Sequence, residues 1–430
     1  MCVRKEKFIF VESVENHNKF WYIEQHEDGM IRTIWGRVGC KETVSEKQFG
    51  ASAGKEYDRL VKSKLKKGYV RLRTIDNEVN DGKTINSIQK KQLEDIALAE
   101  IDYDKSDSDI INIIKVFCRE NIHAITTSTN IIFNSNNNVF QTPCGIVTIE
   151  AVNDARNILN TIYDCVRNND FSSSTFVTNV EMYCAIIPQK IRGKLICTKI
   201  FGSLRDVQKQ NDILDALKDS IETIEQLSKT QTEDSVEKTF KCSIKKVSDR
   251  KIIEIINNLY YKTHQNMHAC RNLKIKNVYA INIDKMSEQF DHLKEKWEAL
   301  HKKLNLMQLW HGTKKQNIIS ILKNGMIIPP SNASHCCGRM FGNYLYFSDQ
   351  STKSLNYAYG WWSGTRDSNC FMFLNDVLMG NAYTPTGSCR HIPSGYDSIF
   401  AKAHISGVQN NEMMVNPNQV CPKFLIEFTE

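Results

Sequence analysis

Two polar stretches, residues 74–87 and 228–239, divide the chain into three segments that differ in hydrophobic periodicity. Segments with different periodicities are expected to build separate cores. The length of 430 residues also indicates more than one core, because a single hydrophobic core stops growing at about 250–300 residues. The sequence therefore predicts a multidomain α+β protein with domains at residues 1–76, 88–227 and 240–430.

The first segment has the pattern of a small antiparallel sheet. In residues 18–25 and 31–39, apolar and polar side chains alternate as in a β-strand. The turn between these two stretches contains Asp28-Gly29, a strong hairpin signal. Residues 55–66 then follow a helical period. The apolar residues of this predicted helix are Tyr57, Leu60, Val61 and Leu65.

The middle segment is predicted to be all-α, and the last segment α+β. Residues 110–121, 149–166 and 210–227 are amphipathic and contain no glycine. The Asn-rich residues 130–140 are predicted to form a loop. After residue 240, short strands, helices and aromatic-rich loops alternate.

The positive charge is concentrated near the N-terminus. Residues 1–76 hold 16 Lys and Arg against 11 Asp and Glu, and residues 62–73 contain six basic residues and no acid. Such a run forms either a solvated helix face or a site for a polyanion, and the charge alone leaves both open.

Other features exclude whole classes of protein. No apolar run approaches the roughly 18 residues that a membrane span needs, and charges interrupt the N-terminal apolar residues. The 14 cysteines show no paired CxxC spacing. We therefore expect an intracellular protein with no membrane partner and no metal.

Three features after residue 240 carry candidate chemistry. Residues 309–326 pass from a strand through His311-Gly312-Thr313 into a helix that ends at Gly325. Residues 344–360, YLYFSDQSTKSLNYAYG, begin as a strand and continue as a helix. Residues 408–415, VQNNEMMV, place Glu412 among apolar neighbours. Each feature alone is compatible with a purely structural role.

In this order, the three features resemble the His-Tyr-Glu signature of the poly(ADP-ribose) polymerase family. The resemblance implies NAD+ as substrate. It implies that backbone groups of Gly312 bind the nicotinamide carboxamide, with a further hydrogen bond from Ser354. Tyr357 would stack on the nicotinamide ring, and Tyr346 would line the opposite side.

The resemblance also implies roles at the ribose and adenosine end. His311 would hold the adenosine ribose, with Thr313 and Asn317 close to it. Glu412 would be the catalytic carboxylate, because a charge beside the ribose stabilises an oxocarbenium-like transition state.

Two positions depart from the family pattern. Ile327 stands where many members have an arginine, and Tyr344 stands where they have a glycine. The stretch between Gly380 and Glu412 is also short for the family. Acceptor preference is therefore left open.

The sequence IWGRVG at residues 34–39 resembles the WGR domain of DNA-dependent members of the family, over about residues 8–73. The resemblance implies that Trp35, Gly36 and Arg37 form a site for a DNA end, where Trp35 packs on a sugar and Arg37 reaches phosphate. Basic side chains would add phosphate contacts. These are Lys62, Lys64, Lys66 and Lys67.

The middle segment resembles the family's regulatory helical domain, which covers the NAD+ site until DNA binding loosens it. Together, the resemblances imply a nuclear poly(ADP-ribose) polymerase that is stimulated by DNA breaks and modifies proteins, itself included. Two alternatives stay open: a mono-ADP-ribosyltransferase, and an inactive transferase fold that acts as a DNA-end scaffold.

Overall fold

The computed structural model describes most of the chain, in two compact units. One unit holds Met1–Lys90 and His123–Glu225, and the other holds Lys91–Ile122 and Gln226–Glu430. No helix in the described part is both long and apolar enough to cross a bilayer. The described residues are 2–12, 17–37, 42–71, 93–129, 131–134, 139–142, 145–190, 195–230, 238–328, 340–361 and 366–430.

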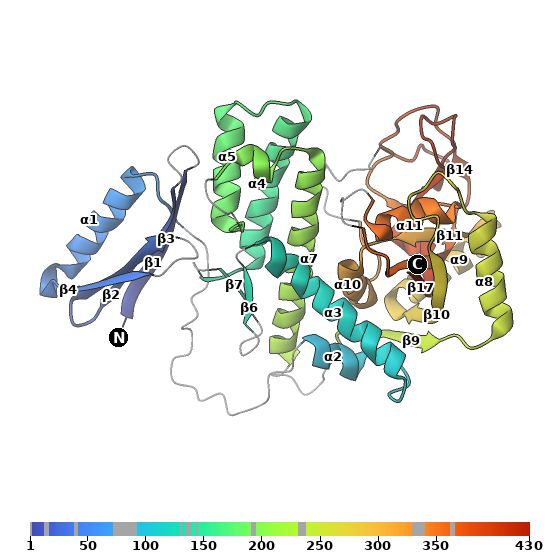
Figure 1. The fold of residues 1–430 in the computed structure, drawn as a ribbon, viewed down its shortest axis with the longest axis horizontal. Coiled ribbons are helices and arrows are strands. Elements are labelled where there is room, and N and C mark those ends of the chain that lie inside the picture. The colour runs from blue at the N-terminus through green and yellow to red at the C-terminus, as the bar shows by residue number, and fades with distance from the viewer. Residues whose placement is uncertain are drawn as a thin grey trace. The chain divides into compact units, whose positions relative to one another are not determined.

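The N-terminal sheet, blue in Figure 1, has five antiparallel strands in the order β4-β3-β2-β1-β5. Gly29 makes the predicted hairpin possible: its φ is 78°, and a Cβ there would lie 2.5 Å from the Gly50 Cα. The strands are β1 (Cys2–Glu12), β2 (His17–His26), β3 (Met30–Arg37), β4 (Thr43–Gln48) and β5 (Val70–Arg71).

Helix α1 (Ala53–Lys66) follows the 3-10 turn η1 (Gly50–Ser52) and covers one face of this sheet. The hairpin and the helix expected from periodicity are therefore confirmed. Their shared core consists of Phe8, Trp21, Ile23, Ile31, Ala53, Tyr57 and Val61.

The middle segment is mainly helical but not all-α. A three-stranded sheet, β6-β7-β8, accompanies its helices. The prediction of a loop at 130–140 is wrong where β6 and β7 form, because Ile131 and Phe140 are buried and supply an apolar face. The elements are β6 (Ile132–Asn134), β7 (Val139–Thr142), β8 (Gly145–Ile146), α4 (Ile149–Arg167), α5 (Ser174–Ile186), α6 (Cys197–Ile200) and α7 (Leu204–Thr230).

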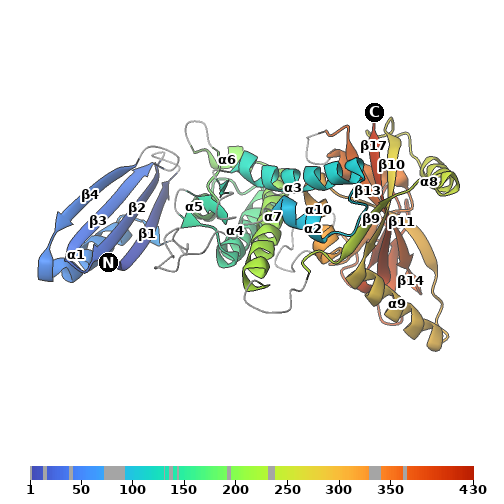
Figure 2. The same ribbon diagram turned by 90° about the horizontal axis from the view of Figure 1, so that it is seen from below.

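The C-terminal unit is built on two sheets, and Figure 2 shows the strands of the larger one close together. The larger sheet is antiparallel, in the order β11-β13-β17-β10-β9, and the smaller has the order β12-β16-β15-β14. The strands are β9 (Cys242–Lys246), β10 (Lys274–Ile283), β11 (Leu306–Gly312), β12 (Leu345–Phe347), β13 (Cys370–Leu378), β14 (Ala382–Tyr383), β15 (Ser398–Ala401), β16 (Glu412–Val415) and β17 (Val420–Thr429).

Helices bury both faces of the larger sheet. Along β13, Phe371 and Phe373 enter one core, while Cys370, Met372 and Leu374 enter the other. This alternation is the period of two expected of a strand. The helices are α2 (Leu93–Glu100), α3 (Ser108–Ser128), α8 (Arg250–Lys262), α9 (Asp284–Ala299), α10 (Lys315–Asn324) and α11 (Ser351–Tyr359), and η2 (Pro417–Gln419) precedes β17. The predicted α+β class is confirmed.

The core of the C-terminal unit includes α2 and the first part of α3. The ring of Phe117 on α3 meets the ring of Phe371 on β13 edge-on, with centroids 4.9 Å apart. The Glu100 carboxylate accepts hydrogen bonds from the backbone amides of Thr239 and Phe240. The three predicted domain boundaries remain a prediction, but residues 93–118 contribute to the core of the C-terminal segment.

This packing predicts that residues 238–430 cannot fold alone. Removing α2 and α3 would expose the apolar side of the sheet to water, and an apolar face of that size promotes aggregation. We expect the fragment to lack a cooperative thermal transition by circular dichroism, whereas the intact chain has one. A cooperative transition of the fragment at the temperature of the intact chain would show that α2 and α3 are dispensable.

Candidate active site

Gly312, the last residue of β11, lies directly against helix α11. A Cβ at this position would lie 1.8 Å from the backbone oxygen of Ser354 and 2.6 Å from its carbonyl carbon. No side chain fits there without moving the helix. The glycine is therefore needed for the close approach of α11, a reason that its place in the sequence did not reveal.

The backbone of Gly312 faces the open edge of the larger sheet. Two residues earlier, Trp310 exchanges both backbone hydrogen bonds with Ser348, on the side away from β13. In a strand, residues i and i+2 point their N–H and C=O groups in the same direction. Gly312 therefore presents a donor and an acceptor on the side of Ser348, which suits a planar carboxamide.

Ser354 and Tyr357 lie on α11 beside this backbone pair. Ser354 is buried, and its hydroxyl donates to the Trp310 carbonyl at 2.9 Å. Its single proton is therefore already used, so donation to a ligand requires the hydroxyl to rotate. Tyr357 is 37% exposed, with the Lys353 ammonium 5.4 Å from its ring centroid.

His311 and Tyr346 are held together by a directed hydrogen bond. The Nδ1 of His311 donates to the Tyr346 carbonyl at 2.9 Å, so a neutral ring presents Nε2 as an acceptor. Burial and the nearby Lys353 ammonium lower the pKa of His311, which keeps the ring neutral at pH 7. The Tyr346 hydroxyl bonds Phe341 and Gly342 in the preceding loop.

Glu412 begins β16 and forms an ion pair with Lys353 on α11, with Oε1 and Nζ 2.7 Å apart. Both side chains are largely buried, at 16% and 11% exposure. The adjacent Ser354 touches Gly312, so two neighbouring residues of α11 connect the carboxylate to the backbone edge at Gly312. Lys353 was not among the predicted site residues, although the spacing KSLNY places it one residue before Ser354.

Thr313 and Asn317 form a small polar group after β11. The Asn317 amide donates to the Thr313 hydroxyl at 3.1 Å, across one turn of backbone.

Of the two departures from the family pattern, Ile327 is 54% exposed. The Tyr344 hydroxyl accepts a hydrogen bond from the Ile392 backbone amide, so this side chain connects the chain just before β12 to the loop before β15.

The predicted DNA-binding residues gather partly around Trp21. Trp35, 37% exposed, pairs with Trp21 across β2 and β3 and shares its sheet face. The Lys64 ammonium lies 5.0 Å from the Trp21 ring centroid, and burial lowers the pKa of Lys64. It is therefore the least available of the four lysines.

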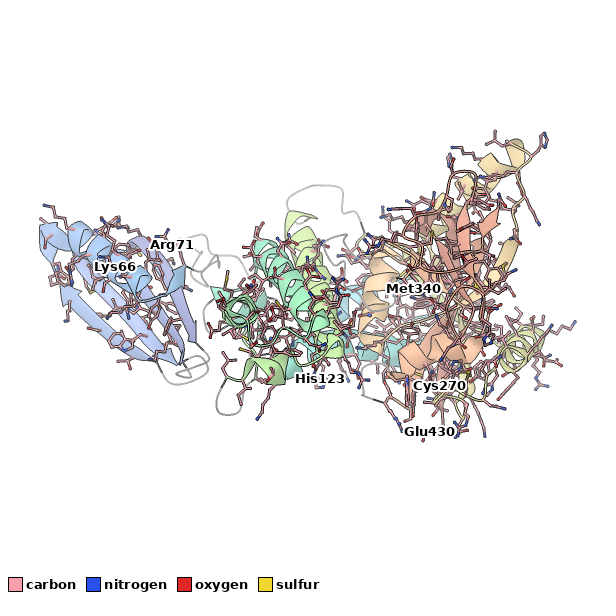
Figure 3. The ribbon with its side chains drawn as sticks, turned by 90° about the horizontal axis from the view of Figure 1, so that it is seen from above. Lys66, Arg71, His123, Cys270, Met340 and Glu430 are labelled. Carbon is pink, nitrogen blue, oxygen red and sulfur yellow. The ribbon has the colours of Figure 1, made fainter. Side chains whose placement is uncertain are left out.

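The other three lysines point into solvent: Lys62, Lys66 and Lys67 are exposed, and Lys66 lies at the end of α1 (Figure 3). Gly36 pairs with Phe20 in the sheet. The backbone of Arg37 ends β3, but its side chain lies outside the described residues.

The contact at Gly312 predicts a specific defect. Gly312→Ala should push α11 off β11, and overpacking of this kind costs about 3 kcal/mol. The melting temperature should fall by roughly 6–12 °C. Gly387→Ala is the matched control, because nothing lies within 4 Å of a Cβ there. Equal melting temperatures for the two variants would disprove the close approach.

Comparisons with known proteins match two of the segments described above. The family profile of the poly(ADP-ribose) polymerase catalytic domain matches residues 251–420, and that of the WGR domain matches residues 6–75. Both ranges contain the motifs that carried the resemblance.

Individual relatives extend the match. Human poly [ADP-ribose] polymerase 2 is 24% identical over 393 residues, which cover 85% of this chain and 63% of that protein, so the chain spans less than two thirds of its length. Human protein mono-ADP-ribosyltransferase PARP3 is 29% identical over 36% of this chain and 29% of its own length. The putative poly [ADP-ribose] polymerase-like 100L of Invertebrate iridescent virus 6 is 33% identical, over 36% of this chain and 85% of its own length. The chain therefore belongs to the poly(ADP-ribose) polymerase family of ADP-ribosyltransferases.

Proposed function

We propose that this chain transfers ADP-ribose from NAD+ to proteins, itself included, as a poly(ADP-ribose) polymerase stimulated by DNA breaks. The observation that carries the proposal is the position of α11. The same helix contacts Gly312 through Ser354 and pairs with Glu412 through Lys353. The strand edge proposed to bind the carboxamide and the proposed catalytic carboxylate thus contact neighbouring residues of one helix.

In the proposed reaction, the carboxamide of nicotinamide bonds the N–H and C=O of Gly312, and Tyr357 stacks on the ring. Nε2 of His311 accepts a hydrogen bond from a ribose hydroxyl, since Nδ1 is occupied by Tyr346. Thr313 and Asn317 lie at the adenosine end.

Glu412 stabilises the positive charge that develops on the ribose as its bond to nicotinamide breaks. Nicotinamide leaves with the bonding electron pair and needs no proton. Glu412 then takes the proton of the acceptor nucleophile as it bonds the ribose carbon. Lys353 holds the carboxylate at this place, by the 2.7 Å ion pair. No metal is part of the proposal.

We propose DNA ends as the activating partner. The support is the exposed Trp35 on the WGR sheet, with Lys62, Lys66 and Lys67 open to phosphate. DNA binding would loosen the helical region and so open the NAD+ site. A DNA-stimulated enzyme works where chromosomal DNA lies, so we place the protein in the nucleus.

The second candidate is a mono-ADP-ribosyltransferase. PARP3, one of the relatives, carries that activity in its name. Product length separates the two: polymer on a denaturing gel supports the first proposal, and single units on the acceptor support the second.

Replacing Glu412 tests the catalytic assignment. Glu412→Gln keeps the shape but removes the charge, so polymer should vanish and NAD+ turnover should fall by about 10²–10³-fold. The assay measures labelled product and released nicotinamide. Glu298→Gln, exposed on α9, serves as the control and should match the parent. Unchanged polymer length in Glu412→Gln would refute the role of this carboxylate.

Replacing Trp35 tests DNA activation. Trp35→Ala should abolish stimulation by nicked DNA and leave the basal rate intact, while Val44→Ala, exposed on the neighbouring strand, should respond like the parent. DNA affinity of the parent should also fall steeply with salt, because phosphate contacts release counterions. If nicked DNA stimulated the Trp35→Ala variant as strongly as the parent, the proposed role of the WGR sheet in DNA binding would be wrong.

A further inference from the structure

Helix α3 carries one polar residue on an otherwise apolar buried face. Ile110, Ile114 and Phe117 enter the core of the C-terminal unit at spacings of four and three residues. The next position in this series is Asn121, which is only 1% exposed. Periodicity calls for an apolar residue there. The presence of an amide therefore requires an explanation.

The Asn121 amide makes a directed contact with helix α10. Its Nδ2 donates to the backbone carbonyl of Gln316 at 2.9 Å. Gln316 is the second residue of α10 and directly precedes Asn317. Asn317 in turn donates to Thr313, immediately after Gly312. A chain of hydrogen bonds thus runs from α3 to the residues that follow β11.

Both helices also contribute apolar side chains to one core. Ile318, Ile319 and Leu322 of α10 pack in the same core as Ile114 and Phe117. Apolar burial is non-directional, so a directed hydrogen bond specifies the register of two helices more sharply than apolar burial does. A buried amide costs free energy unless it is hydrogen-bonded, and it then selects one register.

We propose that Asn121 is a positioning residue for the adenosine side of the NAD+ site. It fixes the first turn of α10 and, through this turn, the side chains of Thr313 and Asn317. The inference rests on the proposed function, and it assigns to α3 a part in substrate binding that no motif in the sequence indicated. Gly312, Ser354 and Tyr357 are set by the contact of α11 with β11 and do not depend on Asn121.

The test compares Asn121→Leu with Asn112→Leu in the full chain. Asn112 is exposed on the same helix, so its replacement controls for the change in composition. Asn121→Leu should raise KM for NAD+ by about threefold to tenfold, the value of one hydrogen bond. Both kcat and inhibition by nicotinamide should stay within about twofold of the parent. The melting temperature should stay the same or rise, because a leucine side chain can pack among the apolar side chains of this core.

The possible outcomes are distinguishable. An unchanged KM in an active Asn121→Leu variant overturns the inference, and so does an equal weakening of NAD+ binding and nicotinamide inhibition. If Asn121→Leu does not fold, Asn121→Ala removes the same donor without added bulk, and the same split between KM and nicotinamide inhibition decides. A parent chain that never turns over NAD+ refutes the proposed function instead.

Discussion

The close approach of α11 to the end of β11 is the contact on which the candidate site depends. The backbone oxygen of Ser354 occupies the space where any side chain of residue 312 would lie. The Ser354 hydroxyl donates to the Trp310 carbonyl in the same strand, so the helix contacts β11 at two alternate positions, residues 310 and 312. Trp310 also bridges to Ser348, which links the two sheets of the unit. One contact therefore aligns a strand edge, a helix and the second sheet.

The proposed chemistry depends on the residue of this helix that directly precedes Ser354. Lys353 pairs with Glu412, so the carboxylate is placed relative to Gly312 by side chains that are largely buried. On the other side of β11, α10 and α3 complete the support through Asn121 and Gln316. The proposed nicotinamide and adenosine ends thus have separate structural supports, so single substitutions can weaken one end and spare the other.

Sequence periodicity predicted the local elements well, because each of them depends on neighbours in the chain. The hairpin at Gly29, helix α1 and the strand-to-helix passage through Gly312 needed only local patterns. Contacts between distant segments could not be read this way. Periodicity placed Phe117 on an apolar face but not against β13, and it could not show that Lys353 pairs with Glu412. It also missed the strands β6 and β7, because asparagines hide a short apolar pattern.

A crystal structure of the intact chain with a non-hydrolysable NAD+ analogue would test the central claim most directly. We expect the carboxamide within about 3 Å of the backbone nitrogen and oxygen of Gly312, a normal hydrogen-bond distance. We also expect the nicotinamide ring against Tyr357 and the adjoining ribose beside Glu412. An analogue bound with its carboxamide elsewhere, or with its ribose away from Glu412, would contradict the account.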